Sequence, residues 1–325
     1  MSRSIDILIP CKDESLYLPS LFEAIRNLKI PVDLSVRFLF SDNNSSDSTV
    51  GMLKELELEG KILFLHEQDV GTRNNLLFLL SKVESEFFMF VDAHDYFTSN
   101  YLSDFYEELN SSNDFNRAFV GKIISMNEVN SKFIPTDIQD NHDFSRFSKI
   151  RVLQLVLFLF HNSIYHAIFP TQHVNRNSLA SSQAFTLDHL ITHSGIGKCN
   201  LKYLESSYYV RRYREIVGPD FTHYVNGEKV TRYQRAVANI DIYTDKLINR
   251  DVKNLIRENH GKILSSLSFW LISGKYTSNV YLKVFYRLTR FVFNKILFLN
   301  PIKIDSSMIP HEILVEISIY ENYGR

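Results

Sequence analysis

The sequence predicts an α/β protein with a doubly wound, mostly parallel sheet flanked by helices, followed by a helical C-terminal extension. Short apolar runs alternate with helical patterns of roughly 10–14 residues over positions 1–125, which is typical of βαβ units. The run Phe87–Val91 is apolar throughout, as expected for a strand buried on both faces of a parallel sheet. From Glu228 onward this alternation stops and the apolar spacing becomes helical.

The elements follow in a regular order. Strands are expected at Ile5–Pro10, Leu34–Phe40, Ile62–Leu65, Phe87–Val91, Ala118–Ser125 and Leu201–Val210. Helices are expected over 15–28, after Thr49, over Thr72–Val83, over Ser99–Asn110 and, as a buried helix, over 150–169. The polar stretch Asn127–Lys149 shows no period and is predicted to be a flexible loop over the site. No Gly-rich loop follows the first strand, which excludes a P-loop or a dinucleotide-binding turn.

Composition narrows the class of protein. Hydrophobic residues make up 45% of the chain, including 25 Phe and 17 Tyr, enough for a large core. The net charge of −1 gives no basis for binding nucleic acid. The two cysteines, Cys11 and Cys199, lie far apart, which favours a reducing compartment over a disulfide scaffold. With no signal-peptide pattern at the start and no apolar run of spanning length, we expect a cytoplasmic protein.

Three titratable side chains follow the apolar run that ends at Val91. Asp92, His94 and Asp95 leave what should be the carboxyl end of a parallel strand, where open α/β sheets bind ligands. Oxygen and imidazole ligands together favour Mn²⁺ or a similar ion over Ca²⁺. The alternative for these residues is a solvated acidic turn after a core strand.

Four motifs in order and at characteristic spacing give this chain a family resemblance. It resembles glycosyltransferase family 2, whose members use sugar nucleotides and have the GT-A fold. The motifs are Ile9-Pro10-Cys11-Lys12-Asp13-Glu14, the polar cluster Ser41–Thr49, Gly71-Thr72-Arg73-Asn74 and Val91-Asp92-Ala93-His94-Asp95.

The resemblance implies roles for the donor site. It places Pro10, Lys12, Glu14 and Asp42 at the nucleotide base, and Arg73 near the base and phosphates. It also assigns Asp92 to the ribose and metal, and makes His94 a metal ligand in an Asp-x-His variant of the family's Asp-x-Asp motif. A similar variant occurs in the polypeptide N-acetylgalactosaminyltransferases. Asp95 is a substitute oxygen ligand, and the expected cofactor is Mn²⁺ or Mg²⁺.

The acceptor side is expected in the second half of the chain. Asp188 stands where the family has the carboxylate base of inverting transfer, although Leu187 replaces the Glu that precedes it. Asp188 as a helix cap, and His189 as the base or a metal ligand, are the alternatives. Arg212 and Arg214 are assigned to the diphosphate, and His223 to a third metal ligand, with an ordinary surface or core histidine as its alternative.

Two regions are expected in the chain. Residues 1–226 form the catalytic domain, with 1–125 as its nucleotide-sugar half and 126–226 as its acceptor half, and 227–325 form the helical region. Within 275–304 the basic residues Lys283, Arg287 and Arg290 share one helical face opposite an apolar, aromatic face. Such a helix either lies in an anionic membrane interface, making the protein peripheral on the cytoplasmic membrane, or packs on the catalytic domain.

These expectations lead to one function and two alternatives. The predicted activity is transfer of a sugar, with inversion, from a UDP-sugar to a saccharide or lipid-linked saccharide during synthesis of a bacterial surface polysaccharide. A nucleotidyltransferase is disfavoured because the chain lacks a Gly-rich basic loop after the first strand. The second alternative is an inactive GT-A module that binds saccharide or a partner transferase, since His94 and Leu187 both depart from the family pattern.

Overall fold

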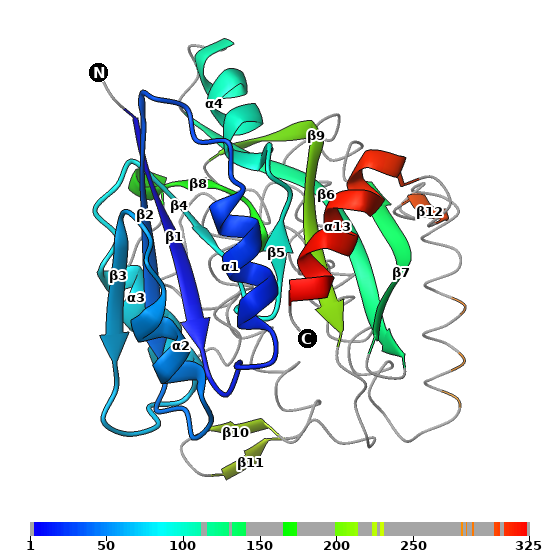
Figure 1. Ribbon diagram of the computed structural model, residues 1–325. Helices are drawn as coiled ribbons and strands as arrows, with labels where there is room; N and C mark the ends of the chain where they lie inside the picture. Colours follow the sequence, from blue (N-terminus) through cyan, green and yellow to red (C-terminus); the bar gives the residue numbers. More distant parts are fainter. Residues whose placement is uncertain are drawn as a thin grey trace.

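The computed structural model describes residues 3–111, 116–129, 132–140, 165–173, 199–213, 223–225, 228–230, 302–305 and 309–323, with positions 281, 284 and 288. Within these ranges the chain forms two five-stranded sheets and a two-stranded hairpin (Figure 1).

The first sheet carries the predicted βαβ units. Strands β1 (Arg3–Cys11), β2 (Leu34–Asp42), β3 (Lys61–Leu65) and β4 (Phe87–Phe90) are parallel, and β8 (Phe169–Pro170) is antiparallel to β4 at the edge. The spatial order is β3-β2-β1-β4-β8. The connecting helices are α1 (Leu18–Arg26), α2 (Thr49–Glu55) and α3 (Thr72–Ser81). The predicted alternation of strands and helices is therefore confirmed for the first half of the chain.

Alternating side chains of β1 and β4 enter different hydrophobic clusters, because successive strand residues point to opposite faces. Ile5, Ile7 and Ile9 pack with Phe87 and Met89 and with the apolar face of α1. Leu8 instead packs with Phe88 and Phe90 and with Leu76, Leu79 and Leu80 of α3. Helices thus cover both faces of the sheet, and this explains why the sequence of β4 is continuously apolar.

The second sheet has the order β12-β7-β6-β9-β5. Its strands are β5 (Tyr96–Phe97), β6 (Arg117–Val129), β7 (Lys132–Asp140), β9 (Asn200–Tyr213) and β12 (Ile302–Asp305), and α4 (Tyr101–Ser111) precedes β6. Since β4 and β5 belong to different sheets, the chain changes sheets within the turn that contains Asp92 and Asp95.

The prediction of a flexible loop over Asn127–Lys149 is wrong for the residues of this range that the structure describes. Residues 127–129 end β6, and Lys132–Asp140 form β7, which pairs with β6 and with β12. The pairing register shifts between Ser125 and Met126, which lies opposite Pro135. A proline at a bulge and the adjacent apolar residues Phe133 and Ile134 break the alternation that would mark a half-buried strand in the sequence.

Two other sequence expectations need correction. The helix predicted over 150–169 does not extend to residue 169. Ile168 forms a β-bridge with Phe119, and Phe169–Pro170 form β8. Positions 150–164 lie outside the described residues. The C-terminal region contributes strands as well as helix. Strand β11 (Glu228–Val230) pairs with β10 (His223–Val225), and β12 pairs with β7, whereas α13 (His311–Tyr323) is helical as expected.

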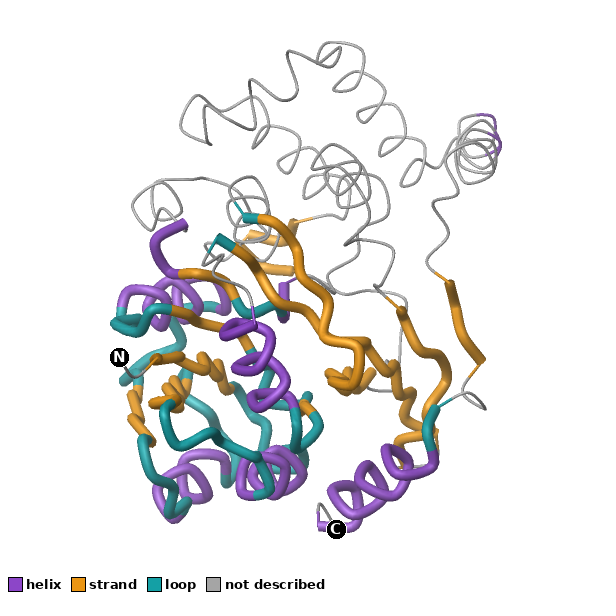
Figure 2. The backbone as a smooth tube through the Cα atoms, turned by 90° about the horizontal axis from the view of Figure 1, so that it is seen from above, coloured by secondary structure: helices purple, strands orange, loops and turns teal. Residues whose placement is uncertain are grey.

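Helix α13 returns to the hydrophobic core of the first half of the chain. Its apolar residues Ile313, Ile317 and Tyr320 join the same hydrophobic cluster as Leu18 and Leu21 of α1. Figure 2 shows α13 beside the strands of the second sheet. None of the helices in the described part of the chain is long and apolar enough to cross a membrane.

A buried carboxylate joins the amino ends of three elements of the first sheet. Asp6 is fully buried and accepts hydrogen bonds from Nε and Nη2 of Arg37 at 2.8 and 2.7 Å and from the hydroxyl of Ser85 at 2.6 Å. The backbone N–H of Glu84 also donates to it. Burial opposes ionisation, but these donors outweigh it and lower the pKa of Asp6.

We predict that Asp6→Asn lowers the free energy of unfolding by about 3 kcal/mol at pH 7, because it breaks a buried ion pair. As the folded-state pKa lies below the ordinary value of 3.8, this stabilisation is complete above that pH and is lost as the pH falls further. Urea unfolding of both proteins at several pH values measures the difference. Glu86→Gln, which removes a surface pair with Arg3, should cost less than about 1 kcal/mol. A difference that persists unchanged in acid would contradict the role of the ionised carboxylate.

Candidate donor and cation site

Loops after β1 and β2 interlock at the carboxyl edge of the first sheet. Nζ of Lys12 donates to the backbone carbonyls of Asn43 and Asn44 at 3.1 and 2.7 Å. The backbone N–H of Asp13 donates to the hydroxyl of Ser45 at 2.9 Å, and the N–H of Ser46 donates to Asp13 at 2.7 Å. The two loops are adjacent because β1 and β2 are parallel neighbours, so one rigid surface forms from sequence motifs about 30 residues apart.

The carboxylate of Asp42 lies within this surface. It is nearly fully buried and accepts a hydrogen bond at 2.9 Å from the backbone N–H of Ser45. Next to it, Asn43 donates to Asp69 at 2.7 Å and accepts from the N–H of Val70 at 2.8 Å. These bonds hold the segment before α3 against the loop after β2.

Arg73 lies in the first turn of α3, two residues after Gly71, which has a φ of 79°. Glycine adopts this left-handed region without a steric penalty, so it allows the sharp entry into the helix. Partial burial lowers the pKa of Arg73, although an arginine remains charged at neutral pH. The third motif therefore meets the first two at the same edge of the sheet.

The turn from Asp92 to Asp95 carries the fourth motif. The N–H of Asp95 donates to the carbonyl of Asp92 at 2.8 Å, which closes the turn. The fully buried carboxylate of Asp95 accepts hydrogen bonds from the Tyr209 hydroxyl at 3.0 Å and from the N–H of Arg212 at 2.8 Å. The same Tyr209 oxygen accepts a bond at 3.3 Å from the N–H of Asp92. Strand β9 therefore fixes the turn from the second sheet.

The imidazole of His94 lies between carboxylates. Its Nδ1 is 3.4 Å from Oε1 of Glu14, and its Nε2 is 3.9 Å from Oδ1 of Asp95. Burial disfavours the charged ring, but the carboxylates of Asp95, Glu14 and Asp92 outweigh burial and raise the pKa of His94 to about 9. These carboxylates therefore favour the charged form of the His94 ring.

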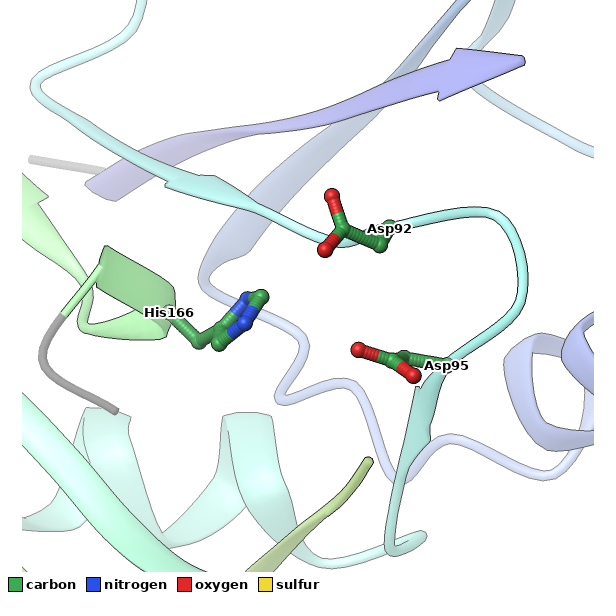
Figure 3. Close-up of side chains that lie close together, drawn as sticks. All are labelled: Asp92, Asp95 and His166. Atoms are coloured by element: carbon green, nitrogen blue, oxygen red, sulfur yellow. The ribbon is translucent and has the colours of Figure 1, made fainter. Parts of the chain in front are cut away.

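A second histidine faces the same turn from another element. His166 precedes β8, is almost fully buried, and stacks on the ring of Tyr209 with the centroids 4.0 Å apart. Burial lowers its pKa, while the charges of Asp92 and Asp95 act in the opposite direction. Figure 3 shows the side chains of Asp92, Asp95 and His166 converging on one space.

These three residues fit a divalent cation. One ligand atom from each lies within 4.8 Å of the others, and His94 is not part of this group among the described residues. Two ligands of one cation lie at most about 4–5 Å apart, because each bond is about 2.0–2.6 Å long. Carboxylate and imidazole donors together suit Mn²⁺ or a similar ion.

Arg212, which the sequence assigned to the diphosphate, points into the protein. Its guanidinium donates to the carbonyl of Tyr17 and to the hydroxyl of Ser20, both at 3.0 Å, and contacts Glu321 of α13 at 3.4 Å. It also lies over the rings of Tyr17 and Tyr96, and Nε donates to the carbonyl of His94. In this structure Arg212 joins α1, the Asp92–Asp95 turn and α13.

Arg211 lies on the opposite face of β9. It is two residues from Tyr209, so both side chains share the strand face that looks toward the turn. Its positive charge contributes to lowering the pKa of His166, which places it near the three converging residues. Arg211 is half-buried, and the sequence analysis did not select it.

Several predicted residues cannot be placed. Asp188, His189 and Arg214 lie outside the described residues. The backbone of His223 pairs with Val230 in the β10–β11 hairpin, but its side chain is outside what the structure describes.

The sequence analysis also missed His166 and Tyr209. The only sign of His166 is a titratable residue inside the apolar stretch Ile164–Phe169, and Tyr209 resembles any aromatic strand residue.

Comparison with known proteins identifies the family. The model described as glycosyl transferase family 2 matches residues 6–169, which include all four motifs and His166. The chain belongs to glycosyl transferase family 2. It is accordingly a nucleotide-sugar-dependent glycosyltransferase, and the resemblance noted in the sequence is confirmed. No curated protein matches the chain.

Solved structures show that the fold is GT-A. S. aureus TarS 1-349 in complex with UDP-GlcNAc has a TM-score of 0.53 at 15% identity, covering 84% of this chain and 80% of that one. S. aureus TarS has a TM-score of 0.52 at 14% identity, and the match covers 85% of this chain but only 44% of TarS. TarS 1-349 in complex with UDP has a TM-score of 0.50 at 14% identity, and the match covers 99% of this chain and 90% of that one.

We predict that Arg212→Lys lowers the free energy of unfolding by about 3 kcal/mol, because lysine cannot make the several buried hydrogen bonds of the planar guanidinium. Urea unfolding measures this loss. Arg26→Lys, an exposed arginine in α1, is the matched control and should stay within about 0.5 kcal/mol of wild type. Wild-type stability in Arg212→Lys would show that the buried contacts contribute little.

Proposed function

We propose that this glycosyltransferase takes a sugar from a UDP-sugar donor and passes it to a hydroxyl of a saccharide or lipid-linked saccharide. The observation that carries the proposal is the convergence of four sequence motifs at the carboxyl ends of β1, β2 and β4, with the entry to α3. Open α/β sheets bind nucleotides at this edge. The choice of UDP as the nucleotide is supported by the similar solved structures, which contain UDP or UDP-GlcNAc.

The interlocked loops after β1 and β2 suit the uracil and ribose. Asp42 presents a buried carboxylate that can accept from the N–H of a base, while Pro10, Lys12 and Glu14 line the neighbouring strand end. The bonds from Lys12 to the carbonyls of Asn43 and Asn44 hold the two loops together before a donor arrives. Such preorganisation reduces the ordering that binding would otherwise require.

The diphosphate is assigned to the region between Arg73, Arg211 and Asp92. We assign Arg211 to the role expected for Arg212, because Arg212 has its guanidinium among protein groups. A divalent cation, Mn²⁺ or Mg²⁺, is proposed at Asp92, with Asp95 as a second oxygen donor. When bound, it neutralises charge that develops on the departing nucleoside diphosphate.

Asp188 is proposed as the base that removes the proton from the acceptor hydroxyl. A carboxylate in this role supports direct displacement at the sugar carbon and hence inversion. Arg214 keeps its proposed place at the diphosphate, whereas His223 is taken as an ordinary histidine of the β10–β11 hairpin, the alternative that the sequence also allows. The domain boundary at 226 and a role in bacterial surface polysaccharide synthesis also remain proposals from the family resemblance.

A peripheral contact with the cytoplasmic membrane is proposed for 275–304. Tyr281, Val284 and Leu288 are in helical conformation and exposed, and their spacing of three and four residues places them on one side of a helix. Exposed apolar residues beside the basic positions Lys283 and Arg287 match an interfacial helix.

We predict that UDP binds in the presence of Mn²⁺ and that chelation weakens its affinity at least about tenfold, as expected when the cation bridges protein and diphosphate. Asp92→Asn should weaken UDP to a similar extent. Glu86→Gln, which removes a carboxylate near the opposite end of β4, should leave the affinity within about twofold. Isothermal titration calorimetry measures all of these. No UDP binding in any condition would reject the donor, and affinity indifferent to chelation would reject the cation.

We predict that Asp188→Asn lowers kcat about 10²- to 10⁴-fold, the usual contribution of a positioned general base. UDP affinity should stay within about twofold of wild type, because the base contacts the acceptor and not the nucleotide. Release of UDP from a UDP-sugar in the presence of a saccharide acceptor measures kcat. Full activity of Asp188→Asn would assign the base to another residue, with His189→Gln as the next variant.

A further inference from the structure

His166 has one ring nitrogen bonded and one without a partner. Its Nδ1 is 3.2 Å from the backbone carbonyl of Phe90. Its Nε2 is buried and has no hydrogen-bond partner among the described residues. A buried polar atom without a partner is uncommon in folded proteins, and it needs a specific reason.

The bond to Phe90 fixes the tautomer of His166. A carbonyl oxygen only accepts, so Nδ1 must carry the proton, and in the neutral ring Nε2 presents its lone pair. Metal-binding histidines have this arrangement, with one nitrogen on the ion and the other donating to a carbonyl or carboxylate. One ring nitrogen of His166 lies within 4.8 Å of a carboxylate oxygen of Asp92 and of Asp95, and Figure 3 shows the ring facing these two carboxylates.

His94 is arranged differently. Both of its nitrogens already face carboxylates, with Glu14 at 3.4 Å and Asp95 at 3.9 Å. Its ring meets Tyr17 of the loop before α1 edge to face, with the centroids 6.4 Å apart. The contacts of His94 thus connect the turn to the loop after β1.

We propose that His166, together with Asp92 and Asp95, holds the divalent cation of this enzyme, and that His166 rather than His94 supplies the nitrogen ligand. This inference rests on the proposed function, because it names the ligands of the cation assigned there. The nitrogen ligand is then supplied by the segment before β8 and not by the motif after β4. The role of His94 is then to pair with Glu14 and Asp95 beside the cation.

The position of His166 also gives the ligand set a rigid support. The ring stacks on Tyr209, and the hydroxyl of Tyr209 donates to Asp95 at 3.0 Å. A single tyrosine of β9 therefore orients two of the three ligands. Such orientation by a neighbouring residue is common around metal ligands and affects affinity about 10- to 100-fold.

Pulsed electron paramagnetic resonance of bound Mn²⁺, with and without UDP, tests the proposal, because it detects the coupling of a directly bound histidine ¹⁴N. We expect this coupling in wild type and in His94→Gln, and its loss in His166→Gln. Titration followed by the free Mn²⁺ signal should show at least about tenfold weaker binding in His166→Gln. His66→Gln, a half-buried histidine near the carboxyl edge, serves as the matched control and should retain both properties.

Three outcomes would overturn the proposal: loss of the nitrogen coupling in His94→Gln, its retention in folded His166→Gln, or no Mn²⁺ binding with or without UDP. Thermal unfolding and UDP affinity under chelation show whether His166→Gln is folded. If it is not, the His94→Gln spectrum together with His166→Asn decides between the two histidines. UDP binding without any Mn²⁺ would reject this site while leaving the proposed donor intact.

Discussion

The buried carboxylate of Asp95 is the interaction on which the rest of the site depends. It ends the turn after β4, accepts hydrogen bonds from Tyr209 and from the backbone of Arg212, and so fixes the first sheet to the second. An uncompensated buried carboxylate is costly, which means that β9 must be in place for the turn to hold its shape. The loops after β1 and β2 need no such support, since they bond to each other. The proposed donor-binding surface and the proposed cation site are therefore stabilised by different parts of the chain.

The sequence predicted most of the first sheet, for a clear physical reason. Its strands are buried on both faces and its helices are amphipathic, so the apolar pattern of the β1, β2 and β4 segments follows directly from packing. The second sheet was predicted only in part. In β7, Pro135 lies at a bulge and the adjacent apolar residues Phe133 and Ile134 break the alternation, while β12 pairs with β7, a segment far from it in the sequence. Pairing between segments distant in sequence leaves no local signal.

The site shows the same division. Asp42 and Asp92 belong to short motifs at strand ends and Arg73 to a short motif at the start of α3, and the structure brings all three motifs to the same edge of the sheet. The placement of Arg211, Tyr209 and His166 depends on which face of β9 is turned to the Asp92–Asp95 turn, and on how the chain returns before β8. A choice between Arg211 and Arg212 could not be made from composition or spacing. The choice required knowing that Tyr209 faces the turn, because the alternation of side chains along a strand then places Arg211 on the same face and Arg212 on the other.

Helix α13 has a further consequence for how the enzyme assembles. Glu321 accepts a hydrogen bond from the hydroxyl of Tyr96, 225 positions earlier in the chain, and it also pairs with Arg212. Contacts between such distant segments close late in folding, because a large loop must be ordered before they form. The loops after β1 and β2, which are the proposed nucleotide site, arise from neighbouring βα units and can form early. They are thus expected to order before the contacts that join α13 to the Asp92–Asp95 turn.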